Sequence, residues 1–196
     1  SYEEAARLSD ARGLNFVHPF DDLEVMAGAG TVALELLAEA PDIEVLVVPI
    51  GGGGLIAGIG VAAKALKPDI ELIGVQSELY PSMYARFARK ELRCAGDTIA
   101  EGIAVKAPGM LTAGLINHVV DDIVLVPERI IEGAIGLLAR EARTVAEGAG
   151  AAALAALAAD PGRFEGRRVG LVVSGGNIDP HLLANVLLRD LARSGR

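Results

Sequence analysis

Four consecutive glycines, Gly51 to Gly54, stand between two apolar stretches of the chain. The residues before them, Ile43–Ile50, are apolar and rich in β-branched side chains, which is typical of a strand buried on both faces. The residues from Leu55 onward have the pattern of a helix packed on a sheet. Glycine costs about 1 kcal/mol relative to alanine inside a helix, so four in a row indicate that another group approaches the backbone closely.

A strand, a glycine loop and a helix together favour an anion site. The start of a helix presents free N–H groups and the positive end of its dipole, and both attract a phosphate. No charged residue lies between Val45 and Ala63, so recognition would rest on backbone amides and the dipole. Two other interpretations stay open: tight turns with no ligand, and a dinucleotide site. The second is weaker, because Gln76 and Ser77 stand where that site needs an acid.

Predicted strands and helices alternate along the rest of the chain, which predicts an α/β fold of three layers, a mostly parallel sheet with helices on both faces. The predicted strands are Leu14–Phe20, Ile43–Ile50, Ile70–Ser77, His118–Pro127 and Arg167–Ser174. The predicted helices are Tyr2–Arg12, Leu23–Glu39, Leu55–Leu66, Ser82–Leu92, Glu128–Arg143, Gly148–Asp160 and His181–Arg193.

Composition excludes several classes of protein. The chain is 52% hydrophobic with 24 glycines, which is typical of a glycine-rich α/β enzyme core and argues against disorder. A net charge of −8 with no basic cluster argues against a nucleic-acid partner. No apolar run reaches the roughly 18 residues of a membrane span. The single cysteine, Cys94, allows no internal disulfide and favours a reducing compartment, which we expect to be the cytoplasm.

A second glycine-rich loop, "SGGN", starts at Ser174 and follows the last predicted strand. Ligands of open parallel sheets bind at the carboxyl ends of the strands. The tetraglycine loop and the loop at Ser174 both follow strands, so we expect them to lie side by side.

Four segments occur in the same order in a known family: "HPFDDLEVMAGAGTVALELL", "VVPIGGGGLIAGIGVAAKALKP", "IAEGIAV" and "VGLVVSGGN". With them the chain resembles the pyridoxal-phosphate enzymes of the tryptophan-synthase-β fold (fold type II), and most of all the threonine/serine dehydratase and serine racemase branch. The resemblance covers essentially the whole chain. It implies that residues 18–196 are the C-terminal part of the large cofactor-binding domain. Residues 1–17 would be the end of an otherwise missing small mobile domain.

The resemblance implies roles for both loops. Gly51, Gly52, Gly53, Gly54 and Leu55 match the loop whose backbone amides hold the cofactor phosphate. Ser174 matches the residue whose hydroxyl meets the pyridine nitrogen. A neutral hydroxyl gives a weaker electron sink than an aspartate would, which suits elimination better than transamination. The alternative for Ser174 is a hydroxyl that caps the turn.

Two further matched positions each have a structural alternative. Gly102 matches a glycine close to the ring and the substrate, or it serves a simple turn. Glu147 matches a residue near the ring, or it is an acid that complements the dipole of the following helix. Outside the site, we expect Gly28 and Gly30 to permit close packing and His18 to be structural. We expect Lys64 to be a solvated surface charge.

The chain departs from the family in two places. The lysine that forms the Schiff base, in a motif like Ser-Phe-Lys-x-Arg-Gly, lies upstream of every matched segment and is absent here, so we expect no catalytic residue in this chain. The chain then looks like the C-terminal part of a longer enzyme. Gln76 stands where some relatives carry an acidic metal ligand, and Glu78 is displaced by two residues, so we predict no metal site.

The function that the resemblance implies is pyridoxal-phosphate-dependent dehydration and deamination of L-threonine or L-serine to a 2-oxo acid and ammonia. A serine racemase, or another β-elimination or β-replacement enzyme of this fold, is the alternative within the family. A non-catalytic cofactor-binding module is the alternative outside it. The expected partners are the amino-acid substrate, the missing N-terminal part of the same enzyme and further copies in a homo-oligomer, with no nucleic acid and no membrane.

Overall fold

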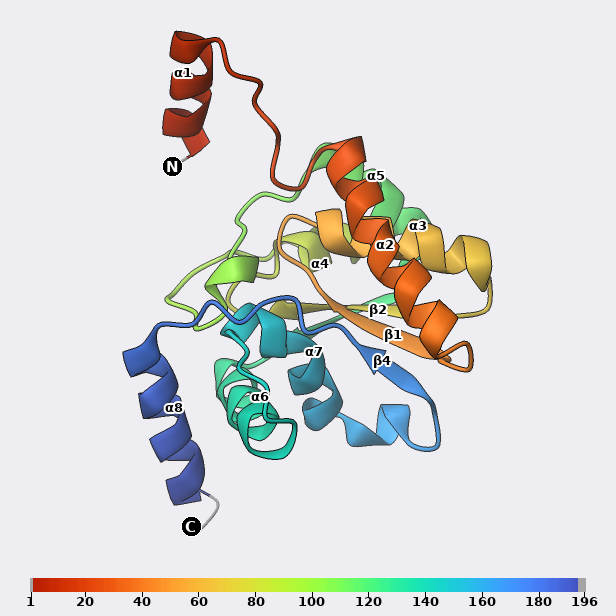
Figure 1. Ribbon diagram of the computed structural model, residues 1–196, viewed down its shortest axis with the longest axis vertical. Coiled ribbons are helices and arrows are strands. Elements are labelled where there is room, and N and C mark those ends of the chain that lie inside the picture. The colour runs from red at the N-terminus through yellow and green to blue at the C-terminus, as the bar shows by residue number, and fades with distance from the viewer. Residues whose placement is uncertain (1, 194–196) are drawn as a thin grey trace.

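The sheet is parallel throughout and lies at the centre of the protein. The computed structural model describes residues 2–193, with side chains from residue 4 onward. Its four strands are ordered β3-β2-β1-β4 (Figure 1). Their bounds are β1 Val45–Pro49, β2 Glu71–Ser77, β3 Asp122–Val126 and β4 Val169–Leu171. In β1, Val47 pairs with Ile73 of β2 and with Leu171 of β4. The prediction of a mostly parallel sheet is confirmed.

Helices cover both faces of the sheet, as predicted (Figure 1). The α-helices are α1 Tyr2–Arg12, α2 Leu23–Glu39, α3 Gly54–Leu66, α4 Ser82–Phe87, α5 Met110–Val119, α6 Glu128–Glu141, α7 Gly148–Ala159 and α8 Pro180–Arg193. Short 3₁₀ turns occur at Glu101–Ile103 and Pro161–Phe164. Helices α2, α3 and α5 lie on one face, and α6 and α7 on the other, with α8 outside α6.

Alternation along β1 divides the core in two. Val45 and Val47 belong to the cluster beneath α6 and α7, whereas Leu46 and Val48 belong to the cluster beneath α2 and α3. All four side chains are fully buried. Successive side chains of a strand point to opposite faces, so a central strand with both faces covered must be apolar at every position.

The strand predicted at Leu14–Phe20 is wrong, because no part of it pairs with the sheet. The Nδ1 atom of His18 instead accepts hydrogen bonds from the backbone N–H groups of Phe20 (3.3 Å) and Asp21 (2.8 Å). These bonds curl the chain into a turn, and His18 is structural as expected. Asp22 follows as the N-cap of α2, accepting from the N–H groups of Glu24 and Val25.

Two helices differ from prediction. Helix α5 was not predicted, because its N-terminal N–H groups are capped by Asp21, which lies far away in sequence. Helix α4 ends at Phe87 rather than Leu92. Two residues beyond that end Arg89 adopts φ +52°, a left-handed conformation that cannot continue a helix. The other predicted elements are confirmed, with ends shifted by a few residues.

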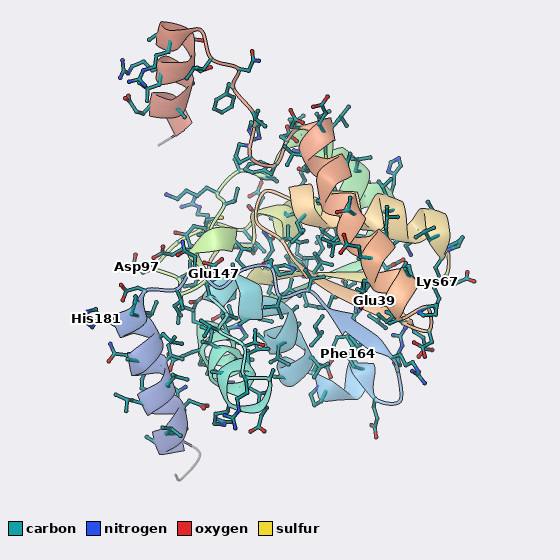
Figure 2. All side chains as sticks on the ribbon, in the orientation of Figure 1. Glu39, Lys67, Asp97, Glu147, Phe164 and His181 are labelled. Atoms are coloured by element: carbon teal, nitrogen blue, oxygen red, sulfur yellow. The ribbon has the colours of Figure 1, made fainter. Side chains whose placement is uncertain are left out.

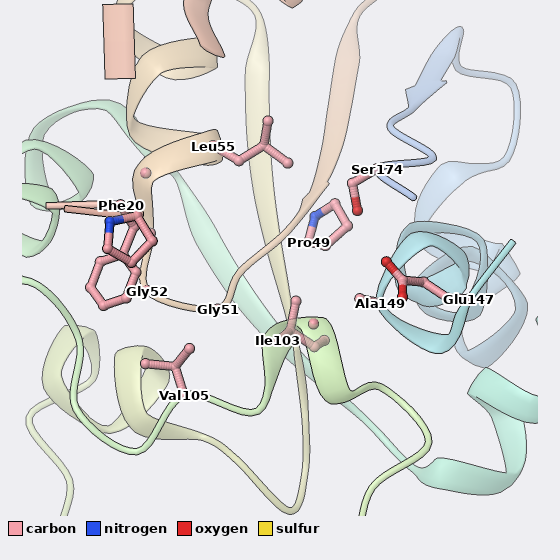
Figure 3. Close-up of a pocket in the computed structure, with 14 residues that line it drawn as sticks. Phe20, Pro49, Gly51, Gly52, Leu55, Ile103, Val105, Glu147, Ala149 and Ser174 are labelled. Atoms are coloured by element: carbon pink, nitrogen blue, oxygen red, sulfur yellow. The ribbon is translucent and has the colours of Figure 1, made fainter. Parts of the chain in front are cut away.

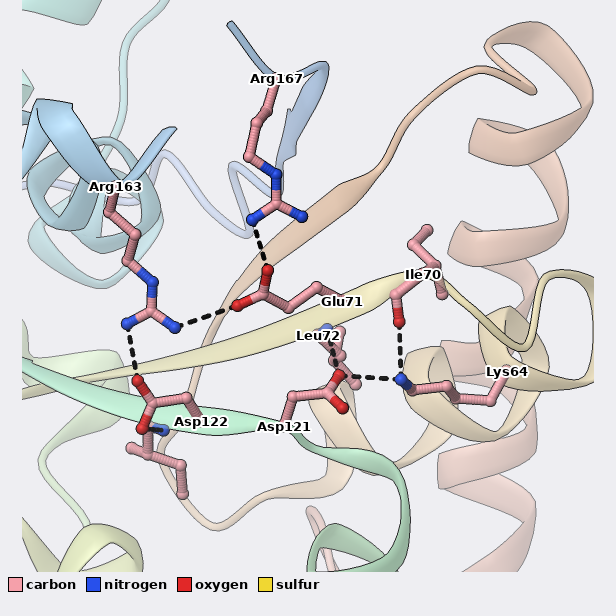
Figure 4. Close-up of polar contacts among 9 residues, drawn as sticks. Lys64, Ile70, Glu71, Leu72, Asp121, Asp122, Arg163 and Arg167 are labelled. Carbon is pink, nitrogen blue, oxygen red and sulfur yellow. Dashed lines mark hydrogen bonds and ion pairs between the residues drawn. The ribbon is translucent and has the colours of Figure 1, made fainter. Parts of the chain in front are cut away.

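Lys64 is a structural anchor, so its prediction as a solvated charge is wrong. Its Nζ donates to the carbonyl oxygen of Ile70 (2.6 Å) and to Oδ2 of Asp121 (2.8 Å), as Figure 4 shows. Asp121 Oδ2 also accepts from the N–H of Leu72 (2.7 Å). The ammonium therefore ties α3 to the amino ends of β2 and β3.

The contact between α2 and α3 depends on glycine at two positions. A Cβ added to Gly30 would lie 3.1 Å from the carbonyl oxygen of Gly58, so the prediction of close packing is confirmed for Gly30. It is wrong for Gly28, which faces open space. A Cβ added to Gly58 would lie still closer to the carbonyl oxygen of Met26, a requirement for glycine that was not predicted from the sequence.

Among the described helices, no helix has both the length and the apolar character that a membrane span needs.

Helix α1 stands apart from the body in Figure 1, on a linker whose Leu14 and Val17 are exposed. Figure 2 shows Glu147 at the end of the sheet where the strands finish, with Glu39 and Lys67 at the opposite end.

Candidate functional site

A cavity of about 310 Å³ opens at the carboxyl ends of the strands (Figure 3). Its walls come from separate parts of the chain. The lining residues are Pro19, Phe20, Pro49, Gly51, Gly52, Gly53, Gly54, Leu55, Gly102, Ile103, Val105, Glu147, Ala149 and Ser174. All the residues predicted from the sequence to hold the cofactor are among them. The expectation that the two glycine loops meet is therefore confirmed.

The tetraglycine loop leaves its N–H groups free. Within the described chain, the backbone N–H groups of Gly51 through Leu55 donate no hydrogen bond to the protein. Gly53 is the N-cap of α3, has no side chain to cap it and adopts φ +100°, a conformation that strongly favours glycine. The first N–H groups of any helix need partners from outside the helix. Here they line a cavity at the positive end of the α3 dipole, which suits a phosphate.

Part of the requirement for glycine comes from the protein itself. The ring of Phe20 occupies the space that a side chain at Gly52 would need, and a Cβ at Gly54 would lie 2.8 Å from the Phe20 carbonyl oxygen. Figure 3 shows the Phe20 ring beside Gly52. The glycines were expected to admit a ligand, and the contact with Phe20 was not predicted, although this residue lies within the matched segment "HPFDD".

Ser174 lies in the irregular segment after β4, with its hydroxyl directed toward the cavity (Figure 3). The hydroxyl makes no hydrogen bond with any described residue. The alternative interpretation, a hydroxyl that caps the turn, is therefore wrong. The group is available to a ligand.

Glu147 is the N-cap residue of α7, but its carboxylate makes no capping hydrogen bond. In Figure 3 the carboxylate lies at the cavity wall, on the same side as Ser174. Its Oε1 occupies the space beside Gly175 and lies 3.6 Å from where a Cβ of Gly102 would be. The cavity is therefore lined by a carboxylate at Glu147 and by the free N–H groups of the glycine loop.

Gly102 lies in the 3₁₀ turn and backs onto α7. A Cβ there would be 2.9 Å from the Cβ of Ala149, so packing against α7 requires glycine. The turn itself does not, because Gly102 is not among the glycines with positive φ. The segment that leads to Gly102 is held by Glu128, whose carboxylate accepts from Thr98 Oγ1 and from the N–H of Ile99, both at 2.8 Å. No sequence motif distinguished Glu128, because its partners come from distant parts of the chain.

The side chain of Gln76 is bonded within the fold. The side chain is fully buried, its Nε2 donates to the Ile50 carbonyl oxygen (3.2 Å), and its Oε1 accepts from the N–H of Tyr84 (2.8 Å). Both ends of the amide therefore serve the fold. Glu78 is exposed, and the described residues contain no cluster of three or more metal-ligating side chains.

Asp21 ties the cavity to α5. Its carboxylate accepts from the N–H groups of Met110 and Thr112, both at 3.0 Å. Partial burial raises the pKa of this carboxyl, but the backbone hydrogen bonds and the nearby His18 outweigh it, so the pKa lies below its ordinary value. The ionised form of Asp21 therefore stabilises the folded protein.

Residues 1–175 match the model of a family described as pyridoxal-phosphate dependent enzyme. The chain belongs to this family. The cofactor of this pyridoxal-phosphate family requires a phosphate site and contacts for its ring. The free N–H groups at Gly51–Leu55 and the unpartnered hydroxyl of Ser174 provide both, so the residues present fit the group.

The chain is also similar in sequence to individual members of the pyridoxal-phosphate family. An L-threonine ammonia-lyase of Thermotoga maritima is 46% identical over 198 residues, a match that covers 100% of this chain and 49% of the relative. The L-threonine dehydratase catabolic TdcB of Staphylococcus aureus is 42% identical over 92% of this chain and 54% of the relative. The chain thus spans about half the length of these curated relatives.

Solved structures agree on the fold. A threonine deaminase from T.th. superposes with a TM-score of 0.84 at 36% identity, covering 91% of this chain and 60% of that one. A maize serine racemase gives a TM-score of 0.85 at 31% identity, covering 96% of this chain and 60% of that one. The predicted resemblance to the dehydratase and racemase branch is confirmed.

Proposed function

We propose that this chain is the cofactor-binding part of a pyridoxal-phosphate-dependent ammonia-lyase that converts L-threonine or L-serine into a 2-oxo acid and ammonia. The observation that carries the proposal is the meeting, in one cavity, of free backbone N–H groups at Gly51–Leu55 and the unpartnered hydroxyl of Ser174. The 46% identity to an L-threonine ammonia-lyase supports the choice of reaction.

The roles of the cavity residues follow from their chemistry. The N–H groups of the glycine loop would hold the cofactor phosphate through hydrogen bonds and the α3 dipole. When bound, pyridoxal phosphate supplies an electron sink for the α-carbon of an amino acid. Ser174 would donate its O–H to the pyridine nitrogen and, being neutral, would leave that nitrogen unprotonated. Gly102 would allow the ring and substrate to lie close to the backbone, and Glu147 would stand at the wall near the ring.

We further propose that the Schiff-base lysine lies outside this chain. None of the chain's four lysines lines the cavity. Lys64 and Lys67 are engaged at the other end of the sheet, where Lys67 Nζ donates to the carbonyl oxygens of Pro41 (3.0 Å) and Ile43 (2.7 Å). Residues 1–17 would belong to a second domain, an assignment supported by the separation of α1 from the body (Figure 1).

The remaining properties of the whole enzyme stay predictions from the sequence. These are assembly into a homo-oligomer and a cytoplasmic location, the latter resting on the single residue Cys94.

Incubating the full-length enzyme with pyridoxal phosphate and either L-threonine or L-serine tests the proposal. We expect ammonia to form together with 2-oxobutanoate or pyruvate in equal amounts. Formation of D-serine without a 2-oxo acid would support the racemase alternative. Cofactor binding with neither product would support the binding-module alternative.

A further inference from the structure

The carbonyl of Gly52 is held by a buried hydroxyl. Thr112, on α5, donates from Oγ1 to this oxygen at 2.7 Å, and the N–H of Gly109 adds a longer contact at 3.4 Å. Thr112 is fully buried, and Gly52 is buried as well. Neither Thr112 nor its hydroxyl lines the cavity, whereas Gly52 and Gly53 both do.

This hydrogen bond fixes the direction of the next N–H group. A trans peptide is planar, so its C=O and N–H point in opposite directions, and the described chain has no cis peptide. With the Gly52 oxygen turned toward Thr112, the N–H of Gly53 points away from α5 and toward the cavity. Both residues joined by this peptide are glycines, which restrict the backbone dihedral angles very little. The loop could therefore also adopt the flipped peptide without a steric clash from side chains. A flipped peptide would present an oxygen to an anion where the N–H should be.

Thr112 is in turn held by its own neighbours. Its N–H donates to Oδ1 of Asp21 at 3.0 Å, and its Cβ lies 3.0 Å from where a Cβ of Gly53 would be. The backbone and Cβ of Thr112 are therefore held against the loop, and burial leaves its hydroxyl bonded to the Gly52 oxygen. The same carboxylate of Asp21 accepts from Met110, which fixes the start of α5 against the loop.

We propose that Thr112 is a positioning residue that locks the Gly52–Gly53 peptide with its N–H facing the phosphate site. The proposal rests on the proposed function, because it requires the glycine loop to bind the cofactor phosphate. Thr112 acts through the peptide and does not touch the cofactor. Removal of the Thr112 hydroxyl should therefore weaken the binding of a ligand that carries a phosphate. The binding of a ligand without a phosphate should stay unchanged.

The test compares Thr112→Val with Thr112→Ser in the full-length enzyme. Valine keeps the shape and removes the hydroxyl, and serine restores it. We expect the dissociation constant for pyridoxal phosphate, measured by fluorescence titration, to rise about tenfold in Thr112→Val. It should stay within about threefold of wild type in Thr112→Ser. The ³¹P chemical shift of the bound phosphate should change only in the valine variant. Pyridoxal, which lacks the phosphate, should bind all three proteins equally.

Thr31→Val is the matched control, because Thr31 Oγ1 also donates to a glycine carbonyl, that of Gly28, but on the exposed side of α2. It should bind pyridoxal phosphate as wild type does. Thr112→Cys, a weak donor of similar size, serves if the valine variant fails to fold and should be weakened in the same way.

The outcomes separate the two proposals. Failure of the wild-type enzyme to bind pyridoxal phosphate would overturn the proposed function. Wild-type binding with an unchanged affinity in Thr112→Val, or in Thr112→Cys where valine does not fold, would overturn the positioning role. An equal loss of pyridoxal and pyridoxal phosphate would also overturn it, because it would indicate a merely structural effect.

Discussion

The backbone N–H of Glu147 donates a 3.1 Å hydrogen bond to the carbonyl oxygen of Gly175. The bond fastens the start of α7 to the loop that follows β4. Ser174 immediately precedes Gly175 in that loop, so the bond also brings the serine hydroxyl and the Glu147 carboxylate to one cavity. Two segments that no local pattern connects are thus joined at the site.

Gly150→Ala should displace this loop. The carbonyl of Gly175 occupies the space that a Cβ at position 150 needs, and a backbone group cannot move aside as a flexible side chain can. We expect a loss of about 1–3 kcal/mol in the free energy of unfolding, measured by urea titration. Gly133→Ala, in α6 with open space around it, is the control and should not destabilise. Equal stability of both variants would contradict the packing described here.

Glu71 should make stability depend on pH. It accepts from Arg167 and Arg163, and Arg163 also pairs with Asp122 (Figure 4). Burial raises the pKa of Glu71, but the hydrogen bonds and charges of Arg167 and Arg163 outweigh it, so the folded pKa is lowered. The stabilisation is therefore present above the ordinary glutamate pKa and is lost as the pH falls through the lower, folded value.

Glu71→Gln should accordingly cost about 1 kcal/mol at pH 7. Its difference from wild type should shrink as the pH is lowered below 4, which urea unfolding across that range measures. Glu165→Gln is the control, since Glu165 is exposed and no ion pair is found for it among the described residues. A Glu71→Gln difference that is constant between pH 7 and pH 3 would contradict the assignment.

Ser174→Asp should change the protonation of the cofactor ring. A carboxylate facing the pyridine nitrogen stabilises its protonated form through an ion pair, whereas the neutral hydroxyl does not. We expect the ¹⁵N chemical shift of ring-labelled pyridoxal phosphate bound to the full-length enzyme to move toward the protonated value. Ser174→Ala removes one hydrogen bond, worth about 1 kcal/mol, and should change the shift much less. An identical shift in wild type and Ser174→Asp would mean that this serine does not face the nitrogen.

Features set by local pattern were predictable from the sequence. The buried strand Val45–Pro49 and helix α3 follow from their apolar residues, and the loop between them follows from its glycines. Features that depend on distant partners were not. Helix α5 begins where Asp21 caps it, and the Leu14–Phe20 segment curls because His18 binds the backbone of Phe20 and Asp21. Neither relation leaves a periodic signal.

The site shows the same division. Glycine spacing and the resemblance located Gly51–Leu55 and Ser174 correctly at one cavity. The contacts that shape it, from Phe20, Thr112 and Glu128, arise only when the chain is folded. A buried threonine on an unpredicted helix could not be assigned to a loop 60 residues away.

Gly52→Val should expel the cofactor from the full-length enzyme. The Phe20 ring fills the space that the new side chain needs, so either the ring or the loop must move. We expect the affinity for pyridoxal phosphate to fall at least tenfold, measured by equilibrium dialysis. Gly114→Ala, on α5 with open space around it, should keep wild-type affinity. Retention of the cofactor by Gly52→Val at wild-type affinity would show that the loop is not the phosphate site.

The most direct test is an NMR titration of the full-length enzyme, labelled with ¹⁵N-glycine, with pyridoxal phosphate and then with pyridoxal. Hydrogen bonds from backbone amides to a phosphate should shift the signals of Gly51 to Gly54 with the first ligand and leave them nearly unshifted with the second. The signals of Gly13 and Gly166, which lie outside the cavity, should not move with either. Cofactor binding that leaves the four loop glycines unshifted would contradict the account.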